Sequence, residues 1–287
     1  MSKFFCDSNC ELWYDELDEL GITCIQMPYT IDGEEYYYDL GRNTNIPNFF
    51  ERMRNGAIPK TSALNSQEYM EYFEPVLSSG EDIIYVTFSQ KMSGTFNSMQ
   101  RAIDELKEKY PLRKVTVVDS THICKAAGYV VKYAALKHND GSSDEEVEKF
   151  VNEFSRKVQC YFTVADLVYL KRGGRLSTFK AMVGTLLDIK PRIKNTDGAL
   201  ENFDKSKGRK RSLRDIVEDM VRSEPDLDYP ITLMHADCKE DFNLFKEIAL
   251  EHFPTAQFFE QYVGPVIGSH CGPDTIGVIF VSKNSTD

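Results

Sequence analysis

The chain is predicted to be an α/β protein of two domains, on three observations. An apolar and β-branched run, Ile83–Phe88, indicates a buried parallel strand, and Ser93–Thr95 then opens an amphipathic helix. Predicted strands and helices recur along both halves of the sequence. The length of 287 residues suits roughly two domains of about 100–200 residues each. We place the boundary before the strand at Gln159, which gives domains 1–158 and 159–287.

The elements of the first half follow from apolar periodicity and from turn residues. Asp32-Gly33 between alternating apolar residues predicts a hairpin, and Ser143 with Glu146 predicts a capped helix. In chain order we predict a strand at 4–6, a helix at 12–20, a strand at 23–27, a hairpin at 29–38, helices at 49–55 and 65–77, the strand at 83–88 with its helix, a strand at 114–118, and helices at 124–137 and 143–157.

The second half is predicted to begin with a strand at 159–164 and to end with a hairpin. Its arms are 258–263 and 275–280, joined by a segment rich in glycine and proline. Between these elements we predict an apolar segment at 167–170, a helix from 177 to 187, a strand at 190–193, a helix at 212–221, a strand at 231–234 and a helix at 242–252.

Composition excludes several classes of protein. The net charge of -11 argues against nonspecific binding to nucleic acid or to an anionic membrane. Seven cysteines without a C-x-x-C pair argue against a disulfide framework or a zinc site. The sequence shows no signal peptide and no apolar run long enough to span a membrane, so we expect a soluble cytoplasmic protein without a metal.

One stretch departs from the acidic average. Between Lys190 and Arg214, nine basic residues accompany three acidic ones, a local charge of +6. The stretch is either a solvated flexible loop or a docking patch for an anionic partner or ligand.

The junction at Ser93–Thr95 suits an anion. The first N–H groups of a helix have no partner within it, and they carry the positive end of its dipole. Gly94 leaves the backbone open, and the hydroxyls of Ser93 and Thr95 can donate hydrogen bonds. The alternative is a helix N-cap without a further function, which is the commoner use of serine at this position.

Other polar candidates are Thr61 and Ser62 in a loop, Arg172 and Arg175 near a Gly-Gly pair, and His270 among glycines and prolines. The strands at 4–6 and 114–118 both end in Asp-Ser, which suggests polar groups gathered at one edge of a sheet. The sequence contains no phosphate-binding G-x-x-x-x-G-K-[ST] loop and no G-x-S-x-G nucleophile elbow.

Taken together, these motifs resemble the DegV family of fatty-acid-binding proteins over essentially the whole chain. The residues that carry the resemblance are Asp7-Ser8, Thr61-Ser62, Phe88–Thr95, Asp119-Ser120, Arg172–Ser177, Asp188–Pro191, and Gly264–His270 with Gly272-Pro273.

The resemblance implies an N-terminal α/β/α domain on a parallel sheet and a C-terminal α/β domain on a mixed sheet. It also implies a long-chain fatty acid, palmitate or similar, in a tunnel between them, with no cofactor. Residues matching Thr61, Ser93 and His270 hold its carboxylate, and Ser62, Gly94 and Thr95 complete the candidate site.

The resemblance further implies a non-enzymatic role in lipid transport and phospholipid synthesis. The protein presents the fatty acid to a separate kinase subunit, which phosphorylates the carboxylate. Apart from the resemblance, we expect a transient contact with a membrane. The family's arginine near the head group and kinase contact matches Arg175, with Arg172 as the alternative.

The sequence departs from the family pattern at two places. Asp274 stands where a glycine is usual, and we expect it to point away from an anionic ligand. Ala63-Leu64 replace the usual Gln-Pro.

Two alternative functions stay open. One is a hydrolase or acyltransferase with Ser93 as nucleophile and His270 as base. The other is a lipid sensor that contacts a macromolecule through the basic stretch. Apolar residues near the motifs, such as Phe162, Val164 and Ile276, are candidates for the lining of a tunnel, but core packing explains each of them more simply.

Overall fold

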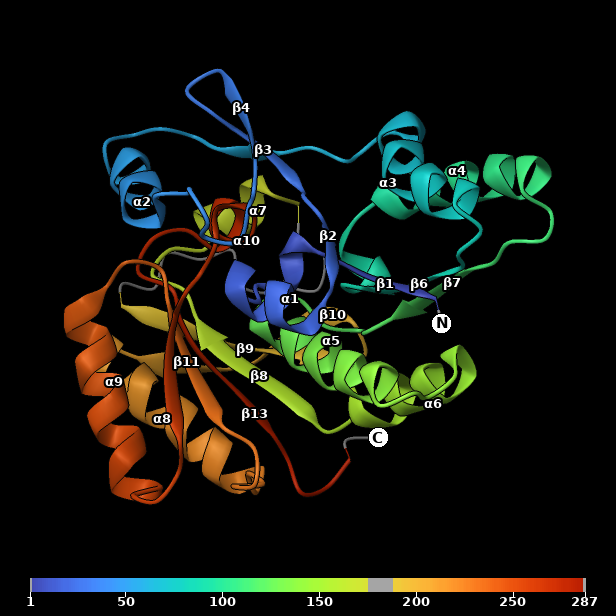
Figure 1. Ribbon diagram of the computed structural model, residues 1–287. Coiled ribbons are helices and arrows are strands. Elements are labelled where there is room, and N and C mark those ends of the chain that lie inside the picture. Colours follow the sequence, from blue (N-terminus) through green and yellow to red (C-terminus); the bar gives the residue numbers. More distant parts are fainter. Residues whose placement is uncertain (1, 175–187, 286–287) are drawn as a thin grey trace. The chain divides into compact units, whose positions relative to one another are not determined.

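The computed structural model describes residues 2–174 and 188–285 (Figure 1). The chain forms two compact units. Unit 1 comprises Met1–Thr44 and Thr61–Ser155, and unit 2 comprises Asn45–Lys60 and Arg156–Asp287. The segment Asn45–Lys60 therefore belongs to unit 2, although it lies in the N-terminal half of the sequence.

Unit 1 is built on a four-stranded parallel sheet in the order β2, β1, β6, β7. Its strands are β1 (Lys3–Asp7), β2 (Thr23–Ile25), β6 (Ile83–Thr87) and β7 (Val115–Asp119). Every residue of β6 is buried, as its continuous apolar run predicts for a central parallel strand. The predicted parallel sheet is confirmed.

Helices cover both faces of this sheet. Figure 1 shows α3 and α4 on one side of it and α5 and α6 on the other. The helices of unit 1 are α1 (Tyr14–Leu20), α3 (Ser66–Ser78), α4 (Thr95–Lys109), α5 (Cys124–Asn139) and α6 (Asp144–Phe154), with short 3-10 turns η1 (Ser8–Cys10) and η2 (Gln90–Met92). The predicted cap at Ser143 is confirmed, since its side chain accepts from Glu146 N. Unit 1 therefore has three layers, with the parallel sheet between two layers of helices.

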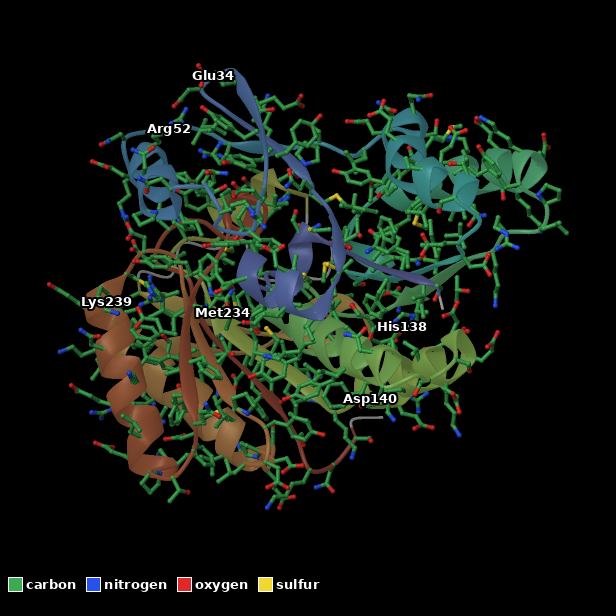
Figure 2. The ribbon with its side chains drawn as sticks, viewed as in Figure 1. Glu34, Arg52, His138, Asp140, Met234 and Lys239 are labelled. Carbon is green, nitrogen blue, oxygen red and sulfur yellow. The ribbon has the colours of Figure 1, made fainter. Side chains whose placement is uncertain are left out.

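A small second sheet in the order β4, β3, β5 contains the predicted hairpin. Its strands are β3 (Pro28–Ile31), β4 (Glu34–Tyr37) and β5 (Lys60–Thr61), and Glu34 lies at the tip of the hairpin (Figure 2). At the other end of unit 1, the ring of Phe4 contacts that of His138 on α5, 5.4 Å between centroids.

Unit 2 is built on a six-stranded mixed sheet in the order β10, β9, β8, β13, β11, β12. Only β11 and β12 are parallel neighbours among its described pairs. The strands are β8 (Val158–Thr163), β9 (Ile189–Thr196), β10 (Ala199–Lys207), β11 (Ile231–His235), β12 (Phe258–Tyr262) and β13 (Ile276–Val281). The mixed sheet expected from the family resemblance is confirmed.

Two long helices, α8 (Arg209–Arg222) and α9 (Lys239–His252), pack on this sheet. The core of unit 2 includes Phe242 and Phe245 from α9 and Phe280 from β13, all at most 1% exposed. Three shorter helices, α2 (Ile46–Arg54), α7 (Val168–Arg172) and α10 (Pro265–Cys271), form a separate layer in which α10 contacts both others.

Two sequence predictions for unit 2 are wrong. The segments 258–263 and 275–280 do not form a hairpin, because β11 lies between β12 and β13 in the sheet and the connection contains α10. The basic stretch 190–214 is not a loop, since it forms the antiparallel pair β9–β10 and the start of α8. The helix predicted at 177–187 lies outside the described residues.

No helix in the described ranges is long and apolar enough to cross a membrane.

Candidate functional site

Polar side chains gather at the carboxyl edge of the parallel sheet of unit 1. Asp7 ends β1 and Asp119 ends β7, and β6 lies between them with Thr87 paired to Asp119. Ser8 and Ser120 follow the two aspartates and are fully buried. The predicted gathering of both Asp-Ser pairs at one edge is confirmed.

Asp7 organises this edge. Its buried carboxylate accepts from the Tyr85 hydroxyl and from the backbone N–H groups of Phe88 and Asn9, each at 3.0 Å. Burial raises the pKa of Asp7 to about 7, against the opposing effect of these hydrogen bonds. The bond to Phe88 N fixes the start of the loop that leads from β6 to Ser93.

The Ser93 hydroxyl is bound at the start of α4, and anion binding at this junction stays a prediction. Ser93 Oγ accepts from the N–H of Thr95, the first residue of α4, at 3.2 Å, while the N-cap residue of the helix is Gly94. The hydroxyl proton of Ser93 is still available to donate, because accepting a hydrogen bond does not use it. Gly94 is exposed, and a Cβ atom added there would meet no described atom within 4 Å.

Thr95 is held differently from Ser93. Its side chain is buried, and its hydroxyl lies 2.9 Å from the hydroxyl of Tyr69 on α3. A hydroxyl has one proton and can accept as well as donate, so one of the two groups donates to the other. Within unit 1, the Thr95 side chain therefore connects α4 to α3, and its part in ligand binding stays a prediction.

Thr61 and Ser62 lie at the small sheet of unit 1. Thr61 is half-buried at the end of β5, and Ser62 is exposed and donates its N–H to Pro28 O at 3.4 Å. The loop thus holds its two hydroxyls on a backbone anchored to β3.

His270 and Arg172 come from neighbouring helices of unit 2. Half-buried His270 lies in the last turn of α10, and exposed Arg172 ends α7. Gly173 follows Arg172 and lies directly against the His270 imidazole, because a Cβ atom added to Gly173 would lie 2.2 Å from His270 Nδ1. Arg175 is outside the described residues.

α2 packs against the other side of α10. A Cβ atom on Gly268 of α10 would lie 2.8 Å from the ring of Phe50 and 3.1 Å from that of Phe49. Both rings are buried. No local sequence pattern connects these phenylalanines with the histidine segment, which follows more than 200 residues later.

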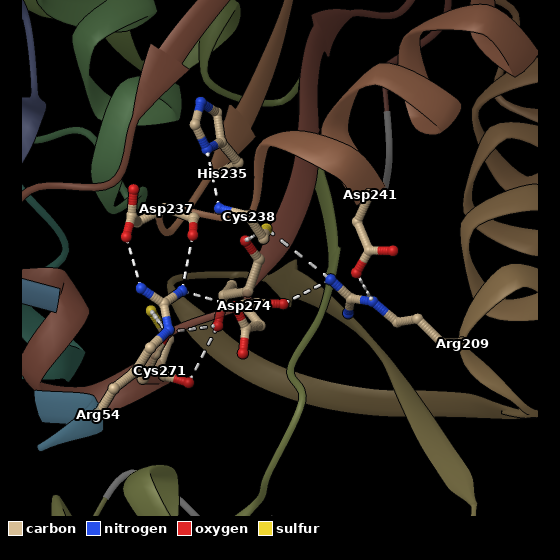
Figure 3. Close-up of polar contacts among 10 residues, drawn as sticks. Arg54, Arg209, His235, Asp237, Cys238, Asp241, Cys271 and Asp274 are labelled. Atoms are coloured by element: carbon tan, nitrogen blue, oxygen red, sulfur yellow. Dashed lines mark hydrogen bonds and ion pairs between the residues drawn. The ribbon is translucent and has the colours of Figure 1, made fainter. Parts of the chain in front are cut away.

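Arg54, the last residue of α2, anchors this helix to two loops of unit 2 (Figure 3). Its guanidinium donates to the Asp237 carboxylate at 2.5 Å, to the Asp237 carbonyl at 2.6 Å and to the Asp274 carboxylate at 2.7 Å. These two carboxylates raise the pKa of Arg54, although partial burial opposes the rise. Asp274 therefore has its carboxylate bound to an arginine.

Asp274 also connects to α8. Its carbonyl accepts from Arg209 Nη2 at 2.6 Å, and Arg209 Nε donates to Asp241 at 2.7 Å (Figure 3). The Asp274 backbone is left-handed, with φ of +62°, a conformation that aspartate adopts more readily than most residues. The segment that follows α10 is thus fixed from two sides.

We expect Arg54→Ala to loosen α2 without unfolding unit 2. The ion pairs of Arg54 are more than a third exposed on the arginine side, so solvent screening limits the loss to about 1 kcal/mol. Hydrogen exchange across 45–60 should accelerate. Arg42→Ala, which removes an exposed pair with Asp18 in unit 1, should leave it unchanged. Equal exchange in wild type and Arg54→Ala would show that the pairs do not hold α2.

A family profile described as "Uncharacterised protein, DegV family" matches residues 2–283. The chain belongs to the DegV family. A DegV domain-containing protein of Clostridium perfringens is 38% identical over 98% of both chains, and one from Caldanaerobacter subterraneus is 31% identical over 96% of this chain and 97% of that one.

Solved DegV structures match the whole chain as well. One is described as "Fatty Acid Binding of a DegV family Protein from Thermus thermophilus", with TM-score 0.84, 26% identity and coverage of 98% of this chain and 99% of that one. Another is described as "Crystal Structure of DegV, a fatty acid binding protein from Bacillus subtilis", with TM-score 0.82, 27% identity and the same coverage. These matches confirm the DegV fold.

Proposed function

We propose that this DegV protein binds a long-chain fatty acid and presents its carboxylate to a separate kinase subunit for acyl-phosphate formation. The observation that carries the proposal is the full-chain similarity to the Thermus and Bacillus DegV structures, both described as fatty-acid-binding. The chain itself acts as the binding subunit, with no cofactor of its own.

The carboxylate ligands are the groups named by the family resemblance. Thr61 and Ser93 supply hydroxyl donors, with Ser62, Gly94 and Thr95 adjoining them, and His270 supplies an imidazole donor. Support in unit 1 comes from the Ser93 hydroxyl at the start of the 15-residue helix α4, whose dipole favours an anion. Neutral donors leave the carboxylate oxygens open to attack on a phosphoryl group, which a bidentate arginine pair would hinder.

The acyl chain supplies the affinity. Burying about 15 methylenes at ~0.8 kcal/mol each contributes roughly 12 kcal/mol. That is comparable to the ~4–15 kcal/mol lost on association. A buried carboxylate must in turn be fully hydrogen-bonded, because an unpaired one costs several kcal/mol. The head group therefore determines the orientation of the ligand.

Delivery requires a surface for the kinase. Exposed Arg172 on α7 belongs to the same α7–α10 layer as His270, and with Arg175 it forms the proposed partner contact. A transient contact with a membrane, where fatty acids enter and acyl phosphates are used, completes the proposed cycle.

The geometry of Ser93 does not favour the hydrolase alternative. The residue is in ordinary extended conformation, with φ of -151° and ψ of 144°, whereas the nucleophile of an α/β-hydrolase stands on a strained strand-to-helix turn. Hydrolysis of an ester by the isolated protein, lost in Ser93→Ala, would revive that alternative.

Mass spectrometry of the protein purified without added lipid tests the proposal. Native spectra should show a stoichiometric adduct that denaturation releases as a long-chain fatty acid. A clean apo mass with no uptake of added palmitate or oleate would overturn the proposal. Adding ATP and a bacterial fatty acid kinase catalytic subunit to the loaded protein, then trapping acyl phosphate with hydroxylamine, tests presentation separately.

Ser93→Ala and His270→Ala should each weaken palmitate binding about tenfold, since each removes one hydrogen bond to a charged group. Calorimetric titration of the delipidated protein measures the effect. Ser98→Ala, which removes a hydroxyl from the next turn of α4, is the matched control and should bind as wild type. Wild-type affinity in both site variants would contradict the proposed carboxylate site.

A further inference from the structure

The two adjacent glycines after α7 serve different purposes. Gly174 has a positive φ of +69°, and a Cβ atom there would meet nothing within 4 Å, so this glycine is required by its backbone conformation. Gly173 has φ of -70° and ψ of -6°, values that any residue adopts. What requires a glycine at position 173 is the imidazole of His270.

The distances show which edge of the ring faces Gly173. A Cβ atom there would lie 2.2 Å from Nδ1, 3.1 Å from Cε1 and 3.2 Å from Cγ of His270. These are the three atoms of the Nδ1 edge, and Nδ1 itself is buried. The Nε2 edge is therefore the one turned away from Gly173.

A reciprocal contact fixes α7 against α10. A Cβ atom on Gly272, just after α10, would lie 2.3 Å from the ring of Tyr169 on α7. Each helix thus places an aromatic ring on a glycine at the end of the other helix. With Phe49 and Phe50 of α2 against Gly268, the backbone that carries His270 has packed neighbours on two sides.

We infer that Gly173 is a positioning residue for His270. Gly173 covers the Nδ1 edge of the imidazole, so that Nε2–H is the donor presented to the ligand carboxylate. This inference rests on the proposed function for its ligand, but the orientation of the ring does not. It also explains why an ordinary backbone conformation is occupied by glycine beside a second glycine.

Substitution of the histidine distinguishes its two nitrogens. The amide nitrogen of glutamine reaches the position of Nε2, whereas that of asparagine reaches the position of Nδ1. We expect His270→Gln to retain palmitate affinity within about threefold of wild type and His270→Asn to lose about tenfold, as His270→Ala does. Better binding by His270→Asn than by His270→Gln would overturn the assignment.

Substitution of the glycine tests the positioning role. Gly173→Ala should displace the ring, which changes the imidazole ¹⁵N shifts in NMR spectra, and should weaken palmitate binding about tenfold. Lys171→Ala, an exposed position of the same helix, should leave the ring signals unchanged. Unaltered ring signals in Gly173→Ala would overturn the inference.

The double variant Gly173→Ala/His270→Ala removes the ring that the new methyl group meets. It should bind palmitate no more weakly than His270→Ala alone, and it should fold even where Gly173→Ala does not. An equal affinity loss from Gly173→Ala in both backgrounds would show that Gly173 acts independently of His270. If His270→Ala binds as wild type while Gly173→Ala still shifts the ring signals, the ring position is upheld and the imidazole–carboxylate contact is refuted.

Discussion

Replacing Asp7 by asparagine is expected to make the protein progressively more stable, relative to wild type, as the pH rises from 4 to 8. Burial raises the pKa of Asp7 to about 7. In this interval the folded state keeps a proton that the unfolded state has lost, so the wild type loses stability as the pH rises. A shift from an ordinary pKa near 4 corresponds to roughly 4 kcal/mol, all of it lost above pH 7. Asparagine does not titrate, and the loss disappears.

His122, in the same unit, changes the stability of the protein with pH in the opposite direction from Asp7. Burial lowers the pKa of His122 to about 4, although a 2.8 Å bond from Nε2 to the Ser155 carbonyl favours the charged form. Between pH 4 and 6.5 the unfolded state binds the extra proton, so this group makes the wild type more stable as the pH rises, by roughly 3 kcal/mol. His122→Gln should remove that gain, and its stability relative to wild type should fall with pH.

The single tryptophan makes these two effects measurable. Trp13 lies in unit 1 beside Gly41, so its fluorescence during urea unfolding reports the unit that contains Asp7 and His122. The difference curves of the two variants against wild type should have opposite slopes between pH 4 and 6.5. Asp140→Asn, at an exposed acid of the same unit, should run parallel to wild type. Parallel curves for all three variants would show that neither buried group titrates as described.

Asp7 and His122 also hold the loop that leads to Ser93 of the candidate site. Asp7 holds Phe88 N at the entrance of the loop to Ser93, and the backbone of His122 accepts from Ser89 N at 2.7 Å in the same loop. These two hydrogen bonds fix the start of the loop that leads to Ser93.

Local patterns predicted the part of the site that lies on contiguous sequence. The apolar run 83–88 and the helix start at Ser93–Thr95 are found as β6 and α4, because a buried parallel strand and a helix N-terminus both have sequence signals within a few residues. The Asp-Ser pairs could be placed at one edge because parallel strands end on the same side of a sheet.

Helix α10 was missed although its boundaries have recognised signals. Gly264-Pro265 and Cys271-Gly272 place proline at the first helical position and glycine just past the end, which is the usual asymmetry of a helix. In a helix of only seven residues the same glycines and prolines also read as turns. The parallel pairing of β12 with β11 was equally hidden, because it depends on a partner distant in sequence.

The supports of His270 had no local signal at all. Arg54 is separated from Asp237 by 183 positions and from Asp274 by 220, and no pattern in one sequence connects charges so far apart. Gly173 and Gly174 look equivalent in the sequence. The structure shows that Gly173 is required by its contact with the His270 imidazole and Gly174 by its backbone conformation. Contacts between residues far apart in the sequence therefore determine the roles of Arg54 and Gly173, which local patterns do not predict.

The basic stretch 190–214 shows the same limit, and Arg192 is its clearest member. Its side chain is 9% exposed and donates to equally buried Asp219 at 2.6 Å, with a second ion pair to Asp204. A charge counted from sequence as part of a docking patch is thus internal. Arg192→Ala should lower the free energy of unfolding by about 3 kcal/mol, because it removes one partner of a buried pair and, among the described residues, leaves Asp219 with the exposed Arg222 as its ion-pair partner.

Lys194, two positions along the same strand, is the matched control for Arg192. It pairs with Glu201 at 3.6 Å, and both side chains are more than a third exposed, so Lys194→Ala should cost less than about 1 kcal/mol. Circular dichroism during urea unfolding measures both variants. Adding Asp219→Asn to Arg192→Ala removes the orphaned charge and should restore part of the loss, which a deficit due only to missing side-chain packing would not do. If Arg192→Ala and Lys194→Ala lowered the free energy of unfolding equally, Arg192 would behave as an exposed charge. That result would strengthen the interpretation of the basic stretch as a docking patch.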